Sequence, residues 1–246
     1  MIREIILEAR AEADRLHSDL GSQSAVESIG GGVDVFGAID RLSVPLLFRP
    51  LDRLLGAYLP PPQVGIMVTS ERSLQIQRFT GAHELGHHVL KHRVSLDTPE
   101  ILDRDPKTRK YDPNEMAADA FASEFLLPDW IFESHAERQR WTSDSLTDPQ
   151  VVYQLSLRVG ASFEATLRQL LTYQFIDGQT YRKFRNIQPR SLKQQLLEGL
   201  RVERWTRDVW LLTEQDEGTL IQGGPEDIFL FRLKQHSGAG YLWSFD

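Results

Sequence analysis

The sequence predicts an α+β protein that is mainly helical, with a small mixed sheet in its first third and a short β segment at its end. Three observations support this prediction. Apolar residues recur at helical spacing over most of the 246 residues, three short runs that favour strands fall between residues 45 and 69, and the pattern changes to that of strands from Val209. Because 41% of the residues are hydrophobic, the chain can bury a core, which excludes global disorder.

Two helices are expected before the sheet. Residues 2–20 alternate charged and apolar side chains at helical spacing, which predicts an amphipathic helix that ends at Gly21. Residues 22–32 are rich in Ser and Gly, which favours an irregular connection, and residues 35–42 are expected to form a short helix.

The sheet is expected to contain three strands, at residues 45–48, 55–59 and 64–69. The prolines at positions 60–62 force a break between the last two strands, because proline cannot donate a backbone hydrogen bond to a sheet.

A long helix is expected over residues 74–91, although Gly81 and Gly86 lie inside it. Each glycine costs a helix about 1 kcal/mol relative to alanine, so their presence indicates that another group approaches the backbone closely.

A polar segment bounded by prolines, residues 98–113, is expected to be an exposed loop. Residues 114–127 then read as a helix, and Pro128 is placed to open a further helix over residues 130–138.

The segment from residue 148 has a different character. Asp148 and Pro149 have the form of an N-cap with proline at the first helical position, Gly160 makes a turn, and Ser162 caps a second helix. Two helices joined by a short glycine-containing turn are the outline of a helix-turn-helix. Beyond them we expect a helix over residues 189–201 and strands over residues 209–213, 218–221 and 228–233.

Composition excludes several functional classes. The chain has no cysteine, which removes disulfides, iron–sulfur clusters, thiol nucleophiles and Cys-ligated zinc, so any metal must be held by His and carboxylates. No apolar run approaches the roughly 18 residues of a membrane span, and the acidic N-terminus does not fit a signal peptide. We therefore expect a cytoplasmic protein with no membrane partner.

The net charge of −7 is unevenly distributed along the chain. Residues 1–150 carry −8, residues 151–207 carry +6 and residues 208–246 carry −5. The acidic total argues mildly against nucleic acid as the main partner, but the basic middle section leaves DNA binding open.

The motif His83-Glu84-Leu85-Gly86-His87 carries the clearest chemistry in the sequence. On a helix the two imidazoles lie one turn apart on one face, where both can bind one Zn²⁺, and Glu84 can act as a general base toward water. The same three-position pattern also arises by chance on ordinary helices. Gly86 is expected to leave space above the metal.

A third ligand is expected from the next helix. Glu115 and Asp119 share one helical face, so Glu115 can ligate the metal while Asp119 accepts the far ring N–H of a ligating histidine. His88 and His92 form a second histidine pair, rotated about 100° around the helix, and are expected to be packing or surface residues.

At this point the sequence resembles the ImmA/IrrE family of bacterial zinc metallopeptidases. The resemblance lies in residues 78–90, Arg-Phe-Thr-Gly-Ala-His-Glu-Leu-Gly-His-His-Val-Leu, and in residues 115–128, Glu-x-x-Ala-Asp-x-Phe-Ala-x-Glu-Phe-Leu-Leu-Pro. It implies a zincin-like fold, an edge strand that can pair with an extended substrate, and a cytosolic endopeptidase that cleaves a helix-turn-helix repressor in a stress response or a mobile-element or defence system.

The resemblance also implies roles for individual residues. His83, His87 and Glu115 would bind one Zn²⁺ per chain, with Mn²⁺ as a substitute in vitro, Glu84 would be the catalytic base, and Asp119 would orient a ligand. The donor that stabilises the oxyanion is left open between Tyr111 and His135.

The expected organisation is a zinc metallopeptidase domain over residues 1–145, a helix-turn-helix-like helical module over residues 146–205, and a β segment over residues 206–246. The β segment weakly resembles the first strands of a chagasin-like domain. We favour a module that packs on the peptidase and guides the substrate, because Arg168 is the one strong base-edge donor on the second helix.

Two other functions remain as alternatives. The first is a DNA-binding or scaffolding regulator whose zinc site is not catalytic, and the second is a protease of a toxin module.

Overall fold

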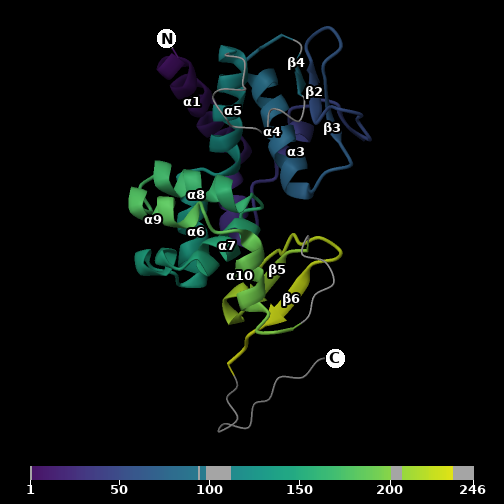
Figure 1. Cartoon of the computed structure of the whole chain (residues 1–246). Coiled ribbons are helices and arrows are strands. Elements are labelled where there is room, and N and C mark those ends of the chain that lie inside the picture. The colour runs from purple at the N-terminus through teal and green to yellow at the C-terminus, as the bar shows by residue number, and fades with distance from the viewer. Residues whose placement is uncertain (1, 94, 98–111, 201–206, 235–246) are drawn as a thin grey trace.

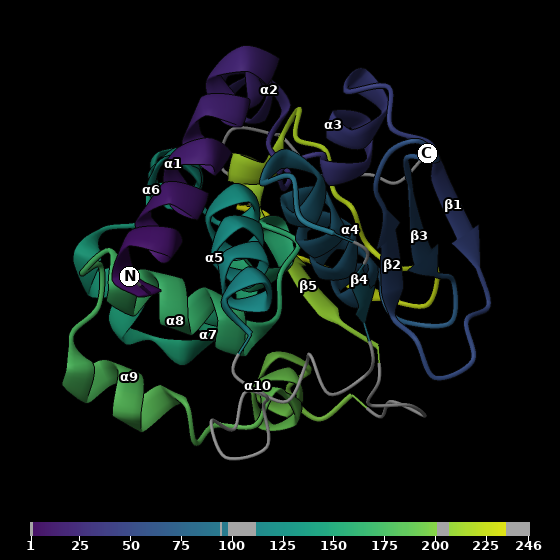
Figure 2. The same ribbon diagram turned by 90° about the horizontal axis from the view of Figure 1, so that it is seen from above.

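The computed structural model describes residues 2–93, 95–97, 112–200 and 207–234. Helix α4 (Leu74–Val89) lies against the sheet, α5 (Pro113–Leu126) lies on the other side of α4, and α1 (Ile2–Leu20) packs on α5 (Figure 2). The helices that follow α5 gather beside one end of this layered arrangement, and a small second sheet lies beyond them (Figure 1).

The N-terminal segment contains one helix more than expected. α1 ends at Gly21, which has a φ of 61°, as predicted, but residues after it form α2 (Ser22–Ile29) instead of an irregular connection. Val26 is buried in the core, so tertiary packing overrides the weak helix propensity of the serines. α3 (Val35–Arg41) follows, and the Asp34 carboxylate caps it by accepting a hydrogen bond from the Gly37 backbone N–H.

The main sheet is small and mixed, as predicted. Its strands are β1 (Leu46–Arg49), β2 (Gly56–Leu59), β3 (Gly65–Thr69) and β4 (Ser95–Asp97), in the order β1-β3-β2-β4. β1 pairs with β3 in parallel, and the other two pairings are antiparallel. β4 was not predicted, because three residues are too few to show a strand pattern. Most of the predicted loop that follows, residues 98–111, lies outside the described residues.

Two glycines allow α4 to pack closely on both sides. A Cβ on Gly56 of β2 would lie within van der Waals contact of Thr80 and 2.6 Å from Glu84 Oε1, so the absent side chain lets α4 approach the sheet. A Cβ on Gly86 would lie 3.0 Å from the Phe121 ring and 3.2 Å from Ala118 Cα. The space beside Gly86 is therefore filled by α5, and the prediction that it clears room above a metal is wrong.

The predicted pair of capped helices is present after α6 (Asp129–Gln139) and a short 3-10 helix, Ser143–Thr147. α7 (Pro149–Arg158) begins at Asp148, whose carboxylate accepts a hydrogen bond from the Gln150 backbone, and α8 (Phe163–Thr172) begins at Ser162, whose hydroxyl accepts one from the Ala165 backbone. Gly160 makes the turn between them with a φ of 68°.

The C-terminal part differs from the prediction in three places. α9 (Gly178–Phe184) was not predicted, and α10 (Pro189–Leu196) ends earlier than expected. β5 (Val209–Leu212) pairs in parallel with β6 (Ile228–Phe231), but residues 218–221 form no strand. The Leu220 backbone N–H instead donates a hydrogen bond to the carbonyl of Ile29, the last residue of α2, so a long-range contact replaces the sheet pairing.

One hydrophobic core runs through the described chain. Phe125 of α5, Leu167 of α8 and Trp210 of β5 belong to the same cluster of buried side chains, although they come from the three expected domains. The division at residues 145 and 205 therefore stays a prediction.

Candidate metal centre

Helix α4 places the two histidines of the motif on one buried face. His83 and His87 are fully buried, and their Nε2 atoms lie 3.0 Å apart, as the spacing of one helical turn requires. The helix is held there by the sheet below it and by α5 above it, so the two rings have little freedom to separate.

Glu115 of α5 completes a group of three. Its Oε2 lies 3.2 Å from His83 Nε2 and its Oε1 lies 3.5 Å from His87 Nε2. One donor atom from each of the three residues lies within 4.8 Å of the others, and in the described part of the chain this is the group suited to hold a metal ion. The structure thus brings together the three side chains that the sequence predicted as ligands.

The donor set fits a divalent metal such as zinc. Two imidazole nitrogens and a carboxylate are a common set for a catalytic zinc site, which keeps a further position open. Asp119 Oδ1 lies 3.0 Å from His83 Nδ1, and an ionised carboxylate can only accept, so the ring proton sits on Nδ1 and the Nε2 lone pair faces the group. The Glu115 side chain is 28% exposed, which leaves the group open to solvent on that side.

The charge of Glu115 suits the same role. Burial raises the pKa of its carboxyl, but hydrogen bonds and charge interactions with His83 and His87 outweigh burial and hold that pKa well below its ordinary value. Glu115 is therefore ionised at neutral pH and available as an anionic ligand.

Glu84 lies next to this group without belonging to it. Its side chain is fully buried where α4 crosses β2 at Gly56. The role of Glu84 as a base stays a prediction.

The second histidine pair lies outside the group, with His92 in contact with His87. His92 Nδ1 lies 3.0 Å from His87 Nδ1, and burial, together with the nearby His87, lowers the pKa of His92 to about 4, so His92 is neutral at pH 7. The His88 ring packs edge-on against Tyr58 of β2 at 5.7 Å between centroids. Neither residue belongs to the three-residue group, in line with the prediction.

Of the two candidates for an oxyanion donor, the described residues include only His135. Tyr111 lies outside the described residues. His135 Nε2 lies 3.0 Å from the Gly31 carbonyl, so this ring joins α6 to the N-terminal segment. Burial lowers the pKa of His135 to about 4.

Two aromatic neighbours of the group were missed by the sequence analysis. The Tyr58 ring is stacked on His87 with 6.5 Å between centroids, and the Phe79 ring lies 6.3 Å from that of His83. Phe79 stands one helical turn before His83, so helical spacing could have indicated it. Tyr58 comes from the strand beneath α4, which local spacing does not reveal.

A buried His–His–Glu group on two packed helices, with a glutamate after the first histidine, is the arrangement of the HExxH metallopeptidases. The profile of the IrrE N-terminal-like domain, Peptidase M78, matches residues 40–171. The match covers more than half of the chain, which therefore belongs to this family, as the resemblance to ImmA/IrrE proteins predicted.

Other comparisons are more distant. A solved structure of a Mycobacterium tuberculosis transcriptional regulator is similar to this chain with a TM-score of 0.42 and 17% identity, over 69% of this chain and 50% of that chain. The chain thus spans half the length of that protein. No curated protein matches the sequence. Within the described residues, every helix is too short or too polar to cross a membrane.

Proposed function

We propose that the protein is a zinc-dependent endopeptidase in which His83, His87 and Glu115 hold one Zn²⁺ and Glu84 is the general base. The observation that carries this proposal is the set of three donor atoms within 4.8 Å of one another in a member of the M78 peptidase family. Family membership implies a protein substrate.

Bound zinc supplies Lewis acidity to the scissile carbonyl and to water. The protein's own residues supply positioning and proton transfer. Asp119 keeps the proton on His83 Nδ1, so that Nε2 stays a donor to the metal. The Glu84 carboxylate takes the proton from the attacking water and returns it to the leaving amine, a role for which its fixed place against β2 is suited.

For the substrate we propose a partner helix-turn-helix repressor in the cytoplasm, cleaved to relieve repression. The packing of α8 supports a helical module that serves the peptidase. The Gln169 amide donates hydrogen bonds to the carbonyl of Ser123 in α5 and to that of Leu127, the residue after α5. This face of α8 is therefore held against the helix that carries Glu115 and cannot enter a DNA groove.

One observation favours a second candidate, a DNA-binding or scaffolding regulator with a non-catalytic zinc site. The net charge of +6 over residues 151–207 would suit phosphate contacts. Salt-sensitive binding of operator DNA by the full chain, with no cleavage of any repressor, would support this candidate.

The test is incubation of the zinc-loaded protein with purified helix-turn-helix repressors of the same organism, followed by mass spectrometry of the products. We expect one or a few cuts that stop with chelator and with Glu84→Gln, a variant that keeps the metal ligands. A Glu133→Gln variant, which changes an exposed glutamate of α6, is the matched control and should cut normally. Cleavage by Glu84→Gln at the wild-type rate would overturn the assigned base.

A further inference from the structure

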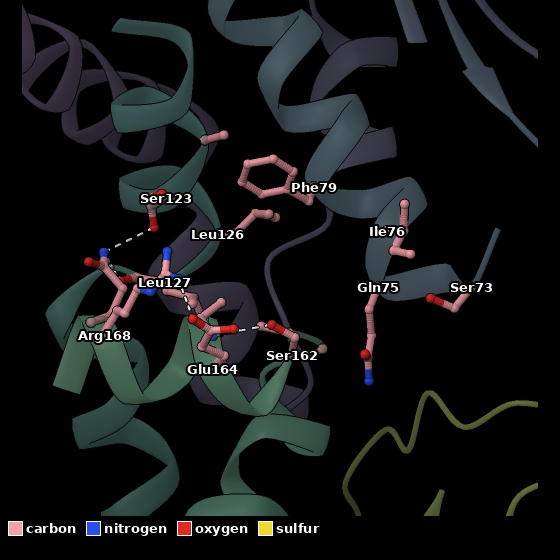
Figure 3. Close-up of a pocket in the computed structure, with 15 residues that line it drawn as sticks. Ser73, Gln75, Ile76, Phe79, Ser123, Leu126, Leu127, Ser162, Glu164 and Arg168 are labelled. Atoms are coloured by element: carbon pink, nitrogen blue, oxygen red, sulfur yellow. Dashed lines mark hydrogen bonds and ion pairs between the residues drawn. The ribbon is translucent and has the colours of Figure 1, made fainter. Parts of the chain in front are cut away.

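A cavity of about 330 Å³ lies where α4, α5 and the start of α8 meet. Figure 3 shows Phe79 and Ile76 of α4 and Leu126 of α5 lining it, with Ser162 and Arg168 of the α8 segment on the remaining side. Neither the catalytic proposal nor the fold requires this space.

The cavity lies one helical turn from residues of the candidate metal centre. α4 and α5 run antiparallel, since His83 meets Asp119 while His87 meets Glu115. A step of one turn back along α4 from His83 reaches Phe79, and a step of one turn forward along α5 from Asp119 reaches Ser123, and both residues line the cavity. One turn is about 5.4 Å.

This distance matches the geometry of an extended peptide. Successive residues of a strand are about 3.3 Å apart, so a side chain one or two positions from a bond held at the metal would reach the cavity. The 6.3 Å between the Phe79 and His83 ring centroids places one wall directly beside a proposed ligand.

The lining is apolar and close to neutral in charge. Phe79 and Ile76 are only half-buried, so each leaves apolar surface facing the cavity. The charged residues in the lining, Glu164 and Arg168, form an ion pair with each other on α8 and leave no net charge for an anionic ligand. Ligand pockets span about 300–1,000 Å³, so this cavity, at the small end, suits a single large side chain.

The wall formed by α8 is held in place. The Gln169 amide donates hydrogen bonds to the Ser123 carbonyl of α5 and to the carbonyl of Leu127, the residue that follows α5, and the Ser162 hydroxyl caps α8, so the third side of the cavity is anchored to the helix that carries Glu115. A preformed pocket of this kind can select among substrates without first being ordered.

We propose that this cavity is a specificity pocket that receives a large apolar side chain, such as Leu, Met or Phe, of the polypeptide cut at the metal centre. The assignment rests on the proposed peptidase function. In this proposal the helix-turn-helix-like segment contributes to substrate binding, because α8 forms one wall of the pocket.

The binding test uses the metal-free protein, so it does not depend on catalysis. The probe is N-acetyl-leucine methylamide, with N-acetyl-glycine methylamide as the control ligand, and the readout is the methyl NMR shifts of Ile76, Leu126 and Ala165. We expect saturable shifts with the leucine compound alone. Ala165→Phe, which fills the cavity from α8, should abolish them, whereas Thr172→Phe, on an exposed position of the same helix, should not.

The second readout is the cleavage profile of the zinc-loaded protein on a mixed peptide library. We expect a preference for a large apolar residue at one position near the cut, reduced at least about 10-fold in kcat/KM by Ala165→Phe and unchanged by Thr172→Phe. Ile76→Ala, which enlarges the cavity, should shift the preference toward aromatic residues.

The outcomes separate the two proposals. Absence of leucine binding, or a cleavage profile that Ala165→Phe leaves unchanged, would overturn the pocket while the peptidase function stands. Leucine binding without any cleavage by the zinc-loaded wild type would overturn the peptidase function, and with it the pocket's part in substrate choice.

Discussion

Gly56→Ala tests how closely α4 must approach the sheet. The new Cβ would lie inside van der Waals contact of the Thr80 methyl group and 2.6 Å from Glu84 Oε1. Both atoms belong to α4, so α4 must move away from β2 or the Glu84 carboxylate must swing out of its place. Overpacking of a core costs about 1–3 kcal/mol, so the free energy of unfolding should fall by that amount.

The effect on catalysis should be larger than the effect on stability. A displacement of about 1 Å in a positioned group can lower a rate by about 100-fold, and Glu84 is the group that Gly56→Ala displaces. We expect kcat to fall by about 10- to 100-fold while zinc affinity changes little, because the two histidines proposed as ligands face α5 and not the sheet. The assays are urea unfolding, zinc titration and single-turnover cleavage of the repressor.

Two further variants make this prediction specific. Gly65→Ala in the neighbouring strand places its Cβ 3.7 Å from the nearest atom, an ordinary contact, and should leave stability and rate unchanged. Adding Thr80→Ser to Gly56→Ala removes the clashing methyl group and should restore part of the lost stability. If Gly56→Ala cleaves at the wild-type rate, the placement of Glu84 against β2 has no part in catalysis and the reasoning is refuted.

Three other predictions follow from the same structure. Asp119→Asn should weaken zinc binding by about 10- to 100-fold in a chelator competition, because the amide no longer fixes the histidine tautomer; wild-type affinity would contradict this role. Burial lowers the pKa of His17 and of His135 from the ordinary 6.5 to about 4 in the folded protein. Between pH 6.5 and 4 the unfolded chain therefore binds more protons than the folded protein, so the stability present above pH 6.5 is lost as the pH falls toward 4. Unfolding free energy should drop by roughly 3 kcal/mol per histidine across this window, and His17→Gln should flatten the profile in urea titrations. Asp216→Ala leaves the buried Arg158 guanidinium without its carboxylate partner and should lower the free energy of unfolding by about 3–5 kcal/mol in thermal unfolding.

The sequence predicted which three side chains come together, because the spacings that indicate them lie within single helices. The i, i+4 spacing of His83 and His87 places both rings on one face, and the Glu115–Asp119 spacing does the same on the next helix. Helix geometry alone brings each pair together, so only the packing of α4 on α5 remained for the structure to supply.

Features that depend on distant segments could not be predicted in this way. Gly56 and Tyr58 meet α4 only through the pairing of β2 within the sheet, and the cavity needs three helices from separate parts of the chain. α2 forms although its composition favours a loop, because Val26 reaches the core. Residues 218–221 have a strand-like composition but are bound to the end of α2 instead.

The most direct test of the zinc centre is an equilibrium zinc titration of the wild type, Glu115→Ala and Glu84→Gln, with metal content measured per chain. The proposal predicts one zinc per chain in the wild type and Glu84→Gln. It predicts a loss in Glu115→Ala greater than the roughly 100-fold limit expected for a residue that only orients a ligand. Wild-type zinc affinity in Glu115→Ala would contradict the His–His–Glu centre on which the proposed activity depends.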